Sequence, residues 1–318
     1  MDIEFLEDEE NTKKRRRVSL NEALSYAMRF LKWFGVVAVF LLLIFIVTLN
    51  VFAFVFNGED DALNSYFSER GIPYKLERID FEDTQLRFLQ TGIEHDSASM
   101  ILFIHGAPGN LDNFKSYLSD IDLRQGFKLI AMDRLGYGGS AYGESETSIA
   151  RQAAAAAAVI RKNKARKIYV FSHSYGGPVS AKLTVDYPDL VDGLIMCAPL
   201  NDPYSEPMHW YSKLANWSIS RSLMPAFIDV ATDEKMTHAK ELKKIEGDWA
   251  KINIPVLHVH GKNDRLAPFE ENVNFSRKNI NEDFLQIYIS DKMGHLNIWV
   301  DAGTIKEKTL NFISQIEG

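Results

Sequence analysis

The chain has 318 residues, of which 46% are hydrophobic and 25% are charged, and its formal net charge is −7. This length suits one large domain or two small ones and is enough for a sizeable core. The acidic balance argues against non-specific binding to nucleic acid, and the single cysteine, Cys197, excludes an intramolecular disulfide framework.

A long uncharged segment near the start predicts a transmembrane helix and makes a lipid bilayer the expected partner. Residues 33–56 read WFGVVAVFLLLIFIVTLNVFAFVF and contain no charged side chain. As a helix they would extend about 36 Å, at about 1.5 Å per residue, which is enough to cross a hydrocarbon core. The apolar part of a cleaved signal peptide is shorter, about 7–15 residues, so we expect a retained signal anchor.

The distribution of Lys and Arg predicts the orientation of this anchor. Residues 1–32 contain seven, including the run KKRRR, whereas the twenty residues after the helix contain two. The positive-inside tendency places the N-terminus in the cytoplasm and residues 57–318 outside it. A nucleic-acid or localisation patch is the alternative interpretation of KKRRR. The outer compartment could be a bacterial periplasm, the medium side of a Gram-positive membrane or an organelle lumen, and the single cysteine favours the inner membrane of a bacterium.

After a polar connector at residues 57–74, short apolar runs alternate with helical patterns. Continuous β-branched and aliphatic runs are typical of parallel strands that are buried on both faces. The alternation predicts an α/β fold with a mostly parallel eight-stranded sheet. The predicted strands are Leu76–Phe81, Leu86–Gln90, Met100–His105, Lys128–Met132, Ile168–Ser172, Gly193–Cys197, Val256–His260 and Phe284–Ile289. The predicted helices are Ser148–Lys162, Tyr175–Tyr187, Glu270–Lys278 and Thr304–Ile316.

The interval 201–254 interrupts this alternation after the sixth strand. It is rich in Trp, Tyr, Met and Leu, and a connection of this length usually has a function. We interpret it as a small helical cap. Trp210, Tyr211 and Trp217 could line an apolar substrate pocket, and they could equally form the cap's own core.

The stretch SHSYGG at residues 172–177 predicts a catalytic serine. A serine on a tight turn from strand to helix needs small residues two positions before and after it, which gives the pattern G-x-S-x-G. Here the first glycine is replaced by Ser172, which is still small, and Gly176 occupies the last position. Ser174 is therefore the candidate nucleophile, with a purely structural turn as the alternative.

A serine nucleophile needs a histidine base that is held by a carboxylate. Asp264 follows the strand predicted at Val256–His260, and His295 follows the last predicted strand. The resulting chain order of serine, aspartate and histidine is characteristic of α/β-hydrolases. Asp202, after the sixth strand, is an alternative acid.

From about residue 74 to 318 the chain resembles proteins of the α/β-hydrolase fold. The resemblance is carried by HGAPGN at 105–110, DRLGYGGS at 133–140, the SHSYGG turn, HGKNDRLAP at 260–268 and MGH at 293–295. It implies that Ser174 is the nucleophile, His295 the general base and Asp264 its orienting acid. It also implies an oxyanion hole made by the backbone N–H groups of Ala107 and Tyr175, with His105, Gly106, Pro108 and Gly109 forming the oxyanion loop.

The resemblance implies acyl transfer by a serine hydrolase acting on a small ester or amide substrate without a cofactor. A carboxylic ester hydrolase is the first expectation. The H-G-x-P-G loop is also similar to that of proline iminopeptidases, so an aminopeptidase or amidase is the second expectation. The loop resembles that of epoxide hydrolases as well, but those enzymes use an aspartate nucleophile, and Ser174 at this position argues against their chemistry. A non-catalytic binding module is the third. The remaining histidines show no spacing that implies a metal site, and the sequence contains no P-loop or dinucleotide fingerprint.

Overall fold

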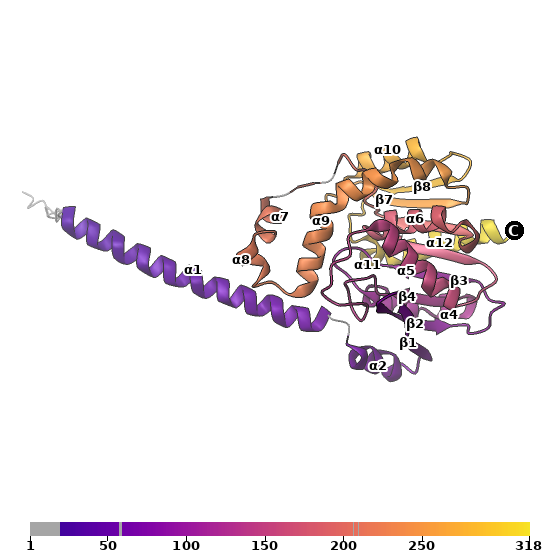
Figure 1. The fold of residues 1–318 in the computed structure, drawn as a ribbon, viewed down its shortest axis with the longest axis horizontal. Coiled ribbons are helices and arrows are strands. Elements are labelled where there is room, and N and C mark those ends of the chain that lie inside the picture. The colour runs from indigo at the N-terminus through magenta and orange to yellow at the C-terminus, as the bar shows by residue number, and fades with distance from the viewer. Residues whose placement is uncertain (1–19, 57–58, 206, 209) are drawn as a thin grey trace, which may run out of the picture. The chain divides into compact units, whose positions relative to one another are not determined.

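The computed structural model describes residues 20–56, 59–205, 207–208 and 210–318, so most of the predicted cytoplasmic tail lies outside the described residues. The chain divides into two compact units, Met1–Thr48 and Leu49–Gly318 (Figure 1). Helix α1 (Leu20–Phe56) begins before the predicted Trp33, because residues 20–32 contain no Gly or Pro and are mostly good helix formers. Its segment Asn21–Val51 contains an 18-residue stretch with a mean hydropathy of 2.8 and is long and apolar enough to cross a membrane.

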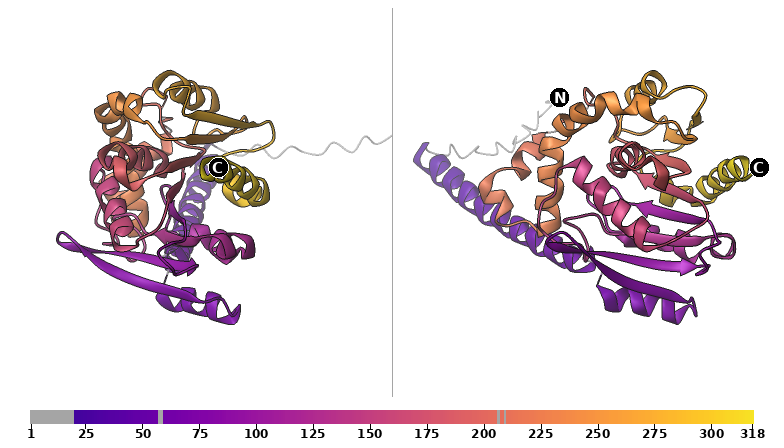
Figure 2. Two further views of the ribbon diagram at one scale, coloured as in Figure 1. Left: turned by 90° about the vertical axis from the view of Figure 1, so that its right-hand side faces the viewer. Right: turned by 45° about the vertical axis from the view of Figure 1, so that its right-hand side comes forward.

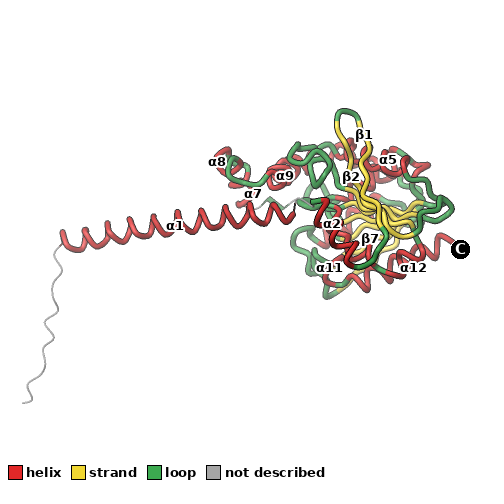
Figure 3. The backbone as a smooth tube through the Cα atoms, turned by 90° about the horizontal axis from the view of Figure 1, so that it is seen from below, coloured by secondary structure: helices red, strands yellow, loops and turns green. Residues whose placement is uncertain are grey.

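The second unit contains one eight-stranded sheet, and all eight predicted strands are present within two residues of their predicted bounds. The strand order is β1-β2-β4-β3-β5-β6-β7-β8. The pairs β1–β2 and β2–β4 are antiparallel and the other five are parallel, which confirms the mostly parallel sheet. Figure 3 shows the β1–β2 hairpin projecting at one edge. The strands are β1 (Tyr74–Phe81), β2 (Thr84–Gly92), β3 (Met100–Ile104), β4 (Lys128–Met132), β5 (Ile168–His173), β6 (Gly193–Cys197), β7 (Val256–Gly261) and β8 (Leu285–Ser290).

Helices cover both faces of the sheet, which explains why its central strands are buried throughout. On one face lie α5 (Ile149–Lys162), α6 (Gly176–Asp186) and α10 (Phe269–Asn279), whose apolar side chains join one core cluster. On the other face lie α2 (Asp60–Glu69), α3 (Lys115–Ser119), α4 (Ile121–Gly126) and α12 (Ala302–Glu317) (Figure 2, left). The four predicted helices of this unit correspond to α5, α6, α10 and α12. The short elements are η1 (Leu111–Phe114), η2 (Pro188–Leu190) and α11 (Asn297–Val300).

The predicted polar connector is wrong in part, because residues 60–69 form helix α2. Its side chains Leu63 and Phe67 are fully buried in the core cluster that also contains α12. Leu63 and Phe67 are four positions apart, so they lie on the same side of the helix. These two side chains pack an otherwise polar segment against the core.

The interval predicted as a cap contains α7 (Trp210–Ala215), α8 (Ser218–Arg221), α9 (Ala226–Ile245) and η3 (Glu246–Lys251). These elements stand between β6 and β7 in the chain. Figure 1 shows α7 and α8 beside the long helix α9, on the side of the domain away from its C-terminus. The buried residues Val230, Glu234 and His238 are four positions apart, so they lie on one side of helix α9, and this side packs against the domain. Helix α9 also contacts α7.

Candidate active site

Ser174 occupies the turn between β5 and α6 in a strained conformation. Its φ is +54°, a region that residues other than glycine rarely adopt. A Cβ at Gly176 would lie 2.6 Å from the carbonyl oxygen of Ile104, and one at Gly106 would lie 2.9 Å from the Cβ of Ser174. Glycine is therefore required at both positions, and the turn places the Ser174 side chain above the carboxyl end of the sheet.

Ser172 replaces the first glycine of the pattern, and the structure supplies a reason. Its side chain is fully buried, with Oγ 2.8 Å from Ser180 Oγ and donating to the carbonyl of Ile195 at 3.2 Å. A buried hydroxyl is costly unless it is hydrogen-bonded, and these partners satisfy it. The small side chain thus fits the turn and links β5 to α6.

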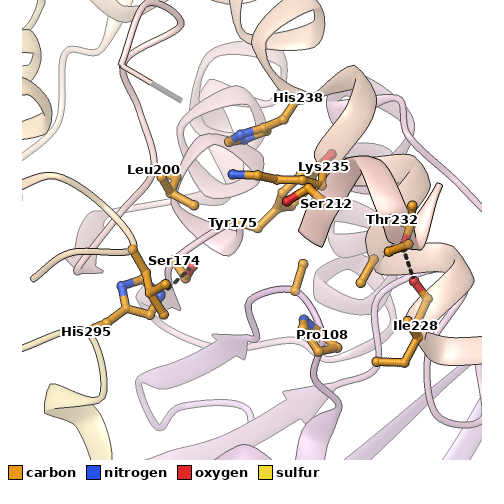
Figure 4. A pocket seen from close by; sticks show the side chains of 14 residues that line it. Pro108, Ser174, Tyr175, Leu200, Ser212, Ile228, Thr232, Lys235, His238 and His295 are labelled. Atoms are coloured by element: carbon orange, nitrogen blue, oxygen red, sulfur yellow. Dashed lines mark hydrogen bonds between the residues drawn. The ribbon is translucent and has the colours of Figure 1, made fainter. Parts of the chain in front are cut away.

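The structure brings Ser174, His295 and Asp264 together in a hydrogen-bonded row. Ser174 Oγ lies 2.9 Å from His295 Nε2 (Figure 4), and His295 Nδ1 lies 2.9 Å from Asp264 Oδ2. Because a carboxylate only accepts, Nδ1 of a neutral ring carries the proton and Nε2 accepts the Ser174 hydroxyl. The three residues follow β5, β7 and β8, whose parallel carboxyl ends share one edge of the sheet.

Asp264 is held as a carboxylate. Burial opposes its ionisation, but hydrogen bonds involving His260 and His295 and the backbone amide of Ala267 outweigh that effect and lower its pKa. The amides of Leu266 and Ala267 both donate to Oδ1 at 2.9 Å. The oxygen Oδ2 is thereby left to accept from the histidine.

Two buried histidines beneath Asp264, His258 and His260, form a hydrogen-bonded chain that no sequence pattern predicts. His260 Nε2 lies 3.0 Å from the carbonyl of Ala267 and 3.3 Å from Asp264 Oδ2. Since a carbonyl only accepts, His260 Nδ1 accepts from His258 Nε2 at 2.9 Å, and His258 Nδ1 accepts from Ser276 at 2.9 Å. Every ring nitrogen in this chain has a partner, so the chain supports the position of Asp264 from below.

The predicted oxyanion loop, residues 105–109 after β3, is held by hydrogen bonds that its own carbonyl groups accept. The carbonyl of Gly106 accepts from His105 Nδ1 at 2.7 Å and from Arg134 Nη2 at 3.0 Å. In a planar trans peptide the N–H points opposite to the carbonyl, so the amide of Ala107 is directed away from Arg134. Within the described part of the chain, neither this amide nor that of Tyr175 donates to a protein acceptor. Pro108 lines the cavity beside Ala107, and a Cβ at Gly109 would lie 2.9 Å from His105 Nδ1.

Arg134 connects this loop to the cap helix α9. Its guanidinium donates to Glu234 Oε1 at 2.5 Å and Oε2 at 3.1 Å, and the hydroxyl of Tyr137 donates to Oε2 at 2.6 Å. Arg134 and Glu234 are 1% and 0% exposed. The same guanidinium lies 4.6 Å from the ring centroid of Tyr175, the first residue after Ser174. Arg134 therefore contacts the cap, the loop at residues 105–109 and the turn that carries Ser174.

A cavity of about 320 Å³ opens above Ser174. Most of its lining is apolar and comes from the oxyanion loop, the segment after β6 and helices α7 and α9 (Figure 4). Polar side chains gather at the cap end, where Ser212, Lys235 and His238 lie. The volume is at the lower end of the range of about 300–1,000 Å³ that is usual for small-molecule sites.

The aromatic residues expected to line a pocket are placed differently. Trp210 and Trp217 are 75% and 55% exposed, and neither is among the described residues that line the cavity. The side chain of Tyr211 lies outside the described residues. The side of α7 that faces the cavity instead carries the small residues Ser212 and Ala215. Asp202, the alternative acid, accepts from the amide of Tyr204 at 3.0 Å and, among the described residues, forms no hydrogen bond or ion pair with Ser174 or His295.

Buried neutral histidines make stability depend on pH. Burial lowers the pKa of His173 from 6.5 to about 3 and holds the pKa values of His105 and His258 well below 6.5. The unfolded chain binds protons below about pH 6.5 that the folded chain does not, so stability should fall by about 1.4 kcal/mol per histidine per pH unit as the pH decreases.

We expect this fall in denaturant unfolding of the full chain in detergent between pH 7 and pH 5. The variant His173→Gln should reduce the slope of the unfolding free energy against pH by the contribution of one histidine, even if it also changes the stability at pH 7. A stability that is constant over this range would contradict the expectation.

Among the described residues, no group of three or more His, Cys, Asp or Glu side chains could hold a metal ion. The histidines near Asp264 are committed to one another and to the carbonyl of Ala267.

Comparisons with known proteins agree with this fold. A family model described as the alpha/beta hydrolase fold matches residues 100–218. An acetyltransferase component of the acetoin cleaving system from Cupriavidus necator is 30% identical over 45% of this chain and 34% of its own. Protein ABHD8 from Mus musculus is 27% identical over 67% of this chain and 55% of its own. The chain thus spans about half or less of the length of these curated relatives.

The solved structures show the same fold. A serine hydrolase involved in carbazole degradation superposes with a TM-score of 0.57, covering 76% of this chain and 100% of its own at 20% identity. At this identity the likeness shows the fold alone.

Proposed function

The chain is an α/β-hydrolase fold protein, and from that premise we propose that it is a serine hydrolase that cleaves carboxylic esters by acyl transfer. The observation that carries the proposal is the row from Ser174 through His295 to Asp264, with both hydrogen bonds at 2.9 Å. A hydroxyl becomes an effective nucleophile when a positioned base takes its proton.

The proposed reaction has two steps. Ser174 Oγ forms a bond to the ester carbonyl carbon while its proton passes to His295 Nε2. The resulting oxyanion accepts hydrogen bonds from the amides of Ala107 and Tyr175, and the alcohol leaves with the proton from His295. Water then attacks the acyl group with His295 as the base, which releases the acid and restores Ser174.

An aminopeptidase-like activity is the weaker candidate. An enzyme that binds a free substrate amine needs a carboxylate in its pocket. No acidic residue lines the cavity in the part of the chain that the structure describes. This lining supports an ester substrate better than a substrate with a free amine.

Covalent labelling tests the proposal. The full chain, purified in detergent, is expected to react with a fluorophosphonate probe, and the variant Ser174→Ala is expected not to react. Ser172→Ala serves as the matched control, because its hydroxyl is buried under the turn and should not affect labelling. Labelling that survives in Ser174→Ala would remove this serine from its role. No labelling of the wild type would favour a non-catalytic binding module.

We also propose that α1 anchors the enzyme with its N-terminus in the cytoplasm and the hydrolase domain outside it, on the periplasmic side of a bacterial inner membrane. The single native cysteine, Cys197, is buried and should not react with a thiol reagent. In bacterial cells with a permeable outer membrane, Glu282→Cys on the exposed domain surface should react with a membrane-impermeant maleimide. Thr12→Cys in the tail should react only after the inner membrane is disrupted, and the reverse pattern would invert the topology.

A further inference from the structure

Helices α7 and α8 of the cap expose large apolar side chains to solvent. Four of them lie within residues 214–223, the apolar cap segment, and each is between 43% and 55% exposed: Leu214, Trp217, Ile219 and Leu223. Figures 1 and 3 show α7 and α8 at the periphery of the hydrolase domain, next to α9. Large apolar side chains that gather in one exposed part of a domain mark an interaction surface.

Helix α7 faces the cavity with one side and carries part of the apolar cap segment on the other. Ser212 and Ala215 line the cavity. The helical turn continues past Ala215, because the amide of Trp217 donates to the carbonyl of Leu214 at 3.1 Å. At about 100° per residue, Leu214 and Trp217 project opposite to Ser212 and Ala215. A partner that covers this surface therefore lies beside the cavity.

The charges around the apolar cap segment suit an anionic surface. Residues 207–228 contain Lys213 and Arg221 and no Asp or Glu, in a chain whose net charge is −7. Arg221 pairs with Asp233 at 2.6 Å, and Lys213 is exposed next to Leu214. Exposed aliphatic and Trp side chains with a neighbouring Lys are typical of segments that lie in the headgroup region of a bilayer.

The chain itself keeps a bilayer within reach of the cap. Helix α1, which we propose as the membrane anchor, ends at Phe56, and α2 begins at Asp60. The four steps between these residues extend at most about 14 Å, at about 3.6 Å per residue. So short a tether gives the domain a high effective concentration of lipid surface, whereas a soluble partner has to be met by diffusion.

We propose that the apolar cap segment docks on the bilayer that α1 crosses, with Trp217 and Ile219 in the headgroup region. The inference rests on the proposed anchor and goes beyond ester hydrolysis. Because the other side of α7 lines the cavity, this docking brings the membrane surface beside the space above Ser174. An ester dissolved in the bilayer then has a short route to the nucleophile.

Quenchers held in the lipid test the inference. The full chain is reconstituted at one copy per nanodisc in phosphatidylethanolamine and phosphatidylglycerol, and the fluorophore NBD is attached through Ser218→Cys. Ser218 is exposed within the apolar cap segment, and the native Cys197 is buried and should not be labelled. Lipid with a doxyl group on its acyl chain is expected to quench this NBD about twofold. Glu282→Cys, before β8 at the opposite edge of the sheet, is the control and should not be quenched.

Matched substitutions show whether the apolar side chains cause the docking. Added to Ser218→Cys, the pair Ile219→Asp and Leu223→Asp should abolish the quenching, because carboxylates are repelled by anionic headgroups. Ile121→Asp on α4 is the control, since Ile121 is equally exposed but lies outside the segment. It should leave the quenching unchanged. Far-UV circular dichroism checks that the variants keep their fold.

The outcomes separate this inference from the proposals on which it depends. If the full chain does not enter nanodiscs, the proposed anchor and the inference both fail. If the chain enters them and NBD is quenched equally at Ser218→Cys and Glu282→Cys, the inference alone fails. An NBD emission shift in detergent that grows with protein concentration, without quenching in nanodiscs, would assign the surface to a second copy and overturn the bilayer. Fluorophosphonate labelling of the same samples reports separately on the proposed hydrolysis.

Discussion

Replacing Asp264 by Asn is expected to lower kcat by about 10⁴-fold with little change in KM, the order seen when a triad carboxylate is lost. The structure predicts how the variant fails. The amides of Leu266 and Ala267 both donate to Oδ1, so the Asn oxygen should keep that position. The amide nitrogen then replaces Oδ2, which is the atom that faces His295 Nδ1.

An amide nitrogen donates and does not accept, so His295 would turn Nδ1 into an acceptor and carry its proton on Nε2. In that form it cannot take the proton of Ser174. Steady-state kinetics with a p-nitrophenyl ester measures the loss. Asp202→Asn is the control and should change kcat by less than about threefold. A larger loss in Asp202→Asn than in Asp264→Asn would make Asp202 the functional acid.

Replacing Glu234 by Ala is expected to lower the free energy of unfolding by about 3–5 kcal/mol, because it leaves the buried Arg134 without its carboxylate. Burial disfavours the charge of Arg134, yet pairing with Glu234 outweighs burial and raises its pKa. The adjacent pair of Asp233 with Arg221 is about 30% exposed on both side chains. Asp233→Ala on the same helix should therefore cost about 0–1 kcal/mol. Equal losses in the two variants, measured by denaturant unfolding, would contradict the role of burial.

A double variant separates stability from positioning. Arg134→Met with Glu234→Leu removes both charges, and apolar replacement of a buried pair is often neutral for stability. It also removes the Arg134 donor that holds the Gly106 carbonyl at 3.0 Å. We expect the double variant to recover stability relative to Glu234→Ala but to keep a lowered kcat. Full recovery of kcat would show that Arg134 does not orient the oxyanion loop.

The order of the strands and of Ser174, Asp264 and His295 could be predicted because each depends on a local pattern. Buried parallel strands appear as short apolar runs, and a polar residue directly after such a run lies at the carboxyl edge of the sheet. The prediction that the three side chains lie together followed from that rule, and the structure places them in hydrogen-bonding contact. Their catalytic roles stay a proposal.

The tertiary structure alone decided which side chains surround this row. Arg134 and Glu234 are one hundred positions apart, and no local pattern indicates that they pair. His258 and His260 appear in the sequence as part of an apolar strand, and only the turn at Ala267 shows that they support Asp264. In the cap, sequence spacing showed which residues share a side of a helix but not which side meets the cavity. Trp210 and Trp217 are exposed while Ser212 and Lys235 line the cavity, because the direction of a helix face is set by the packing of the whole helix and not by its own sequence.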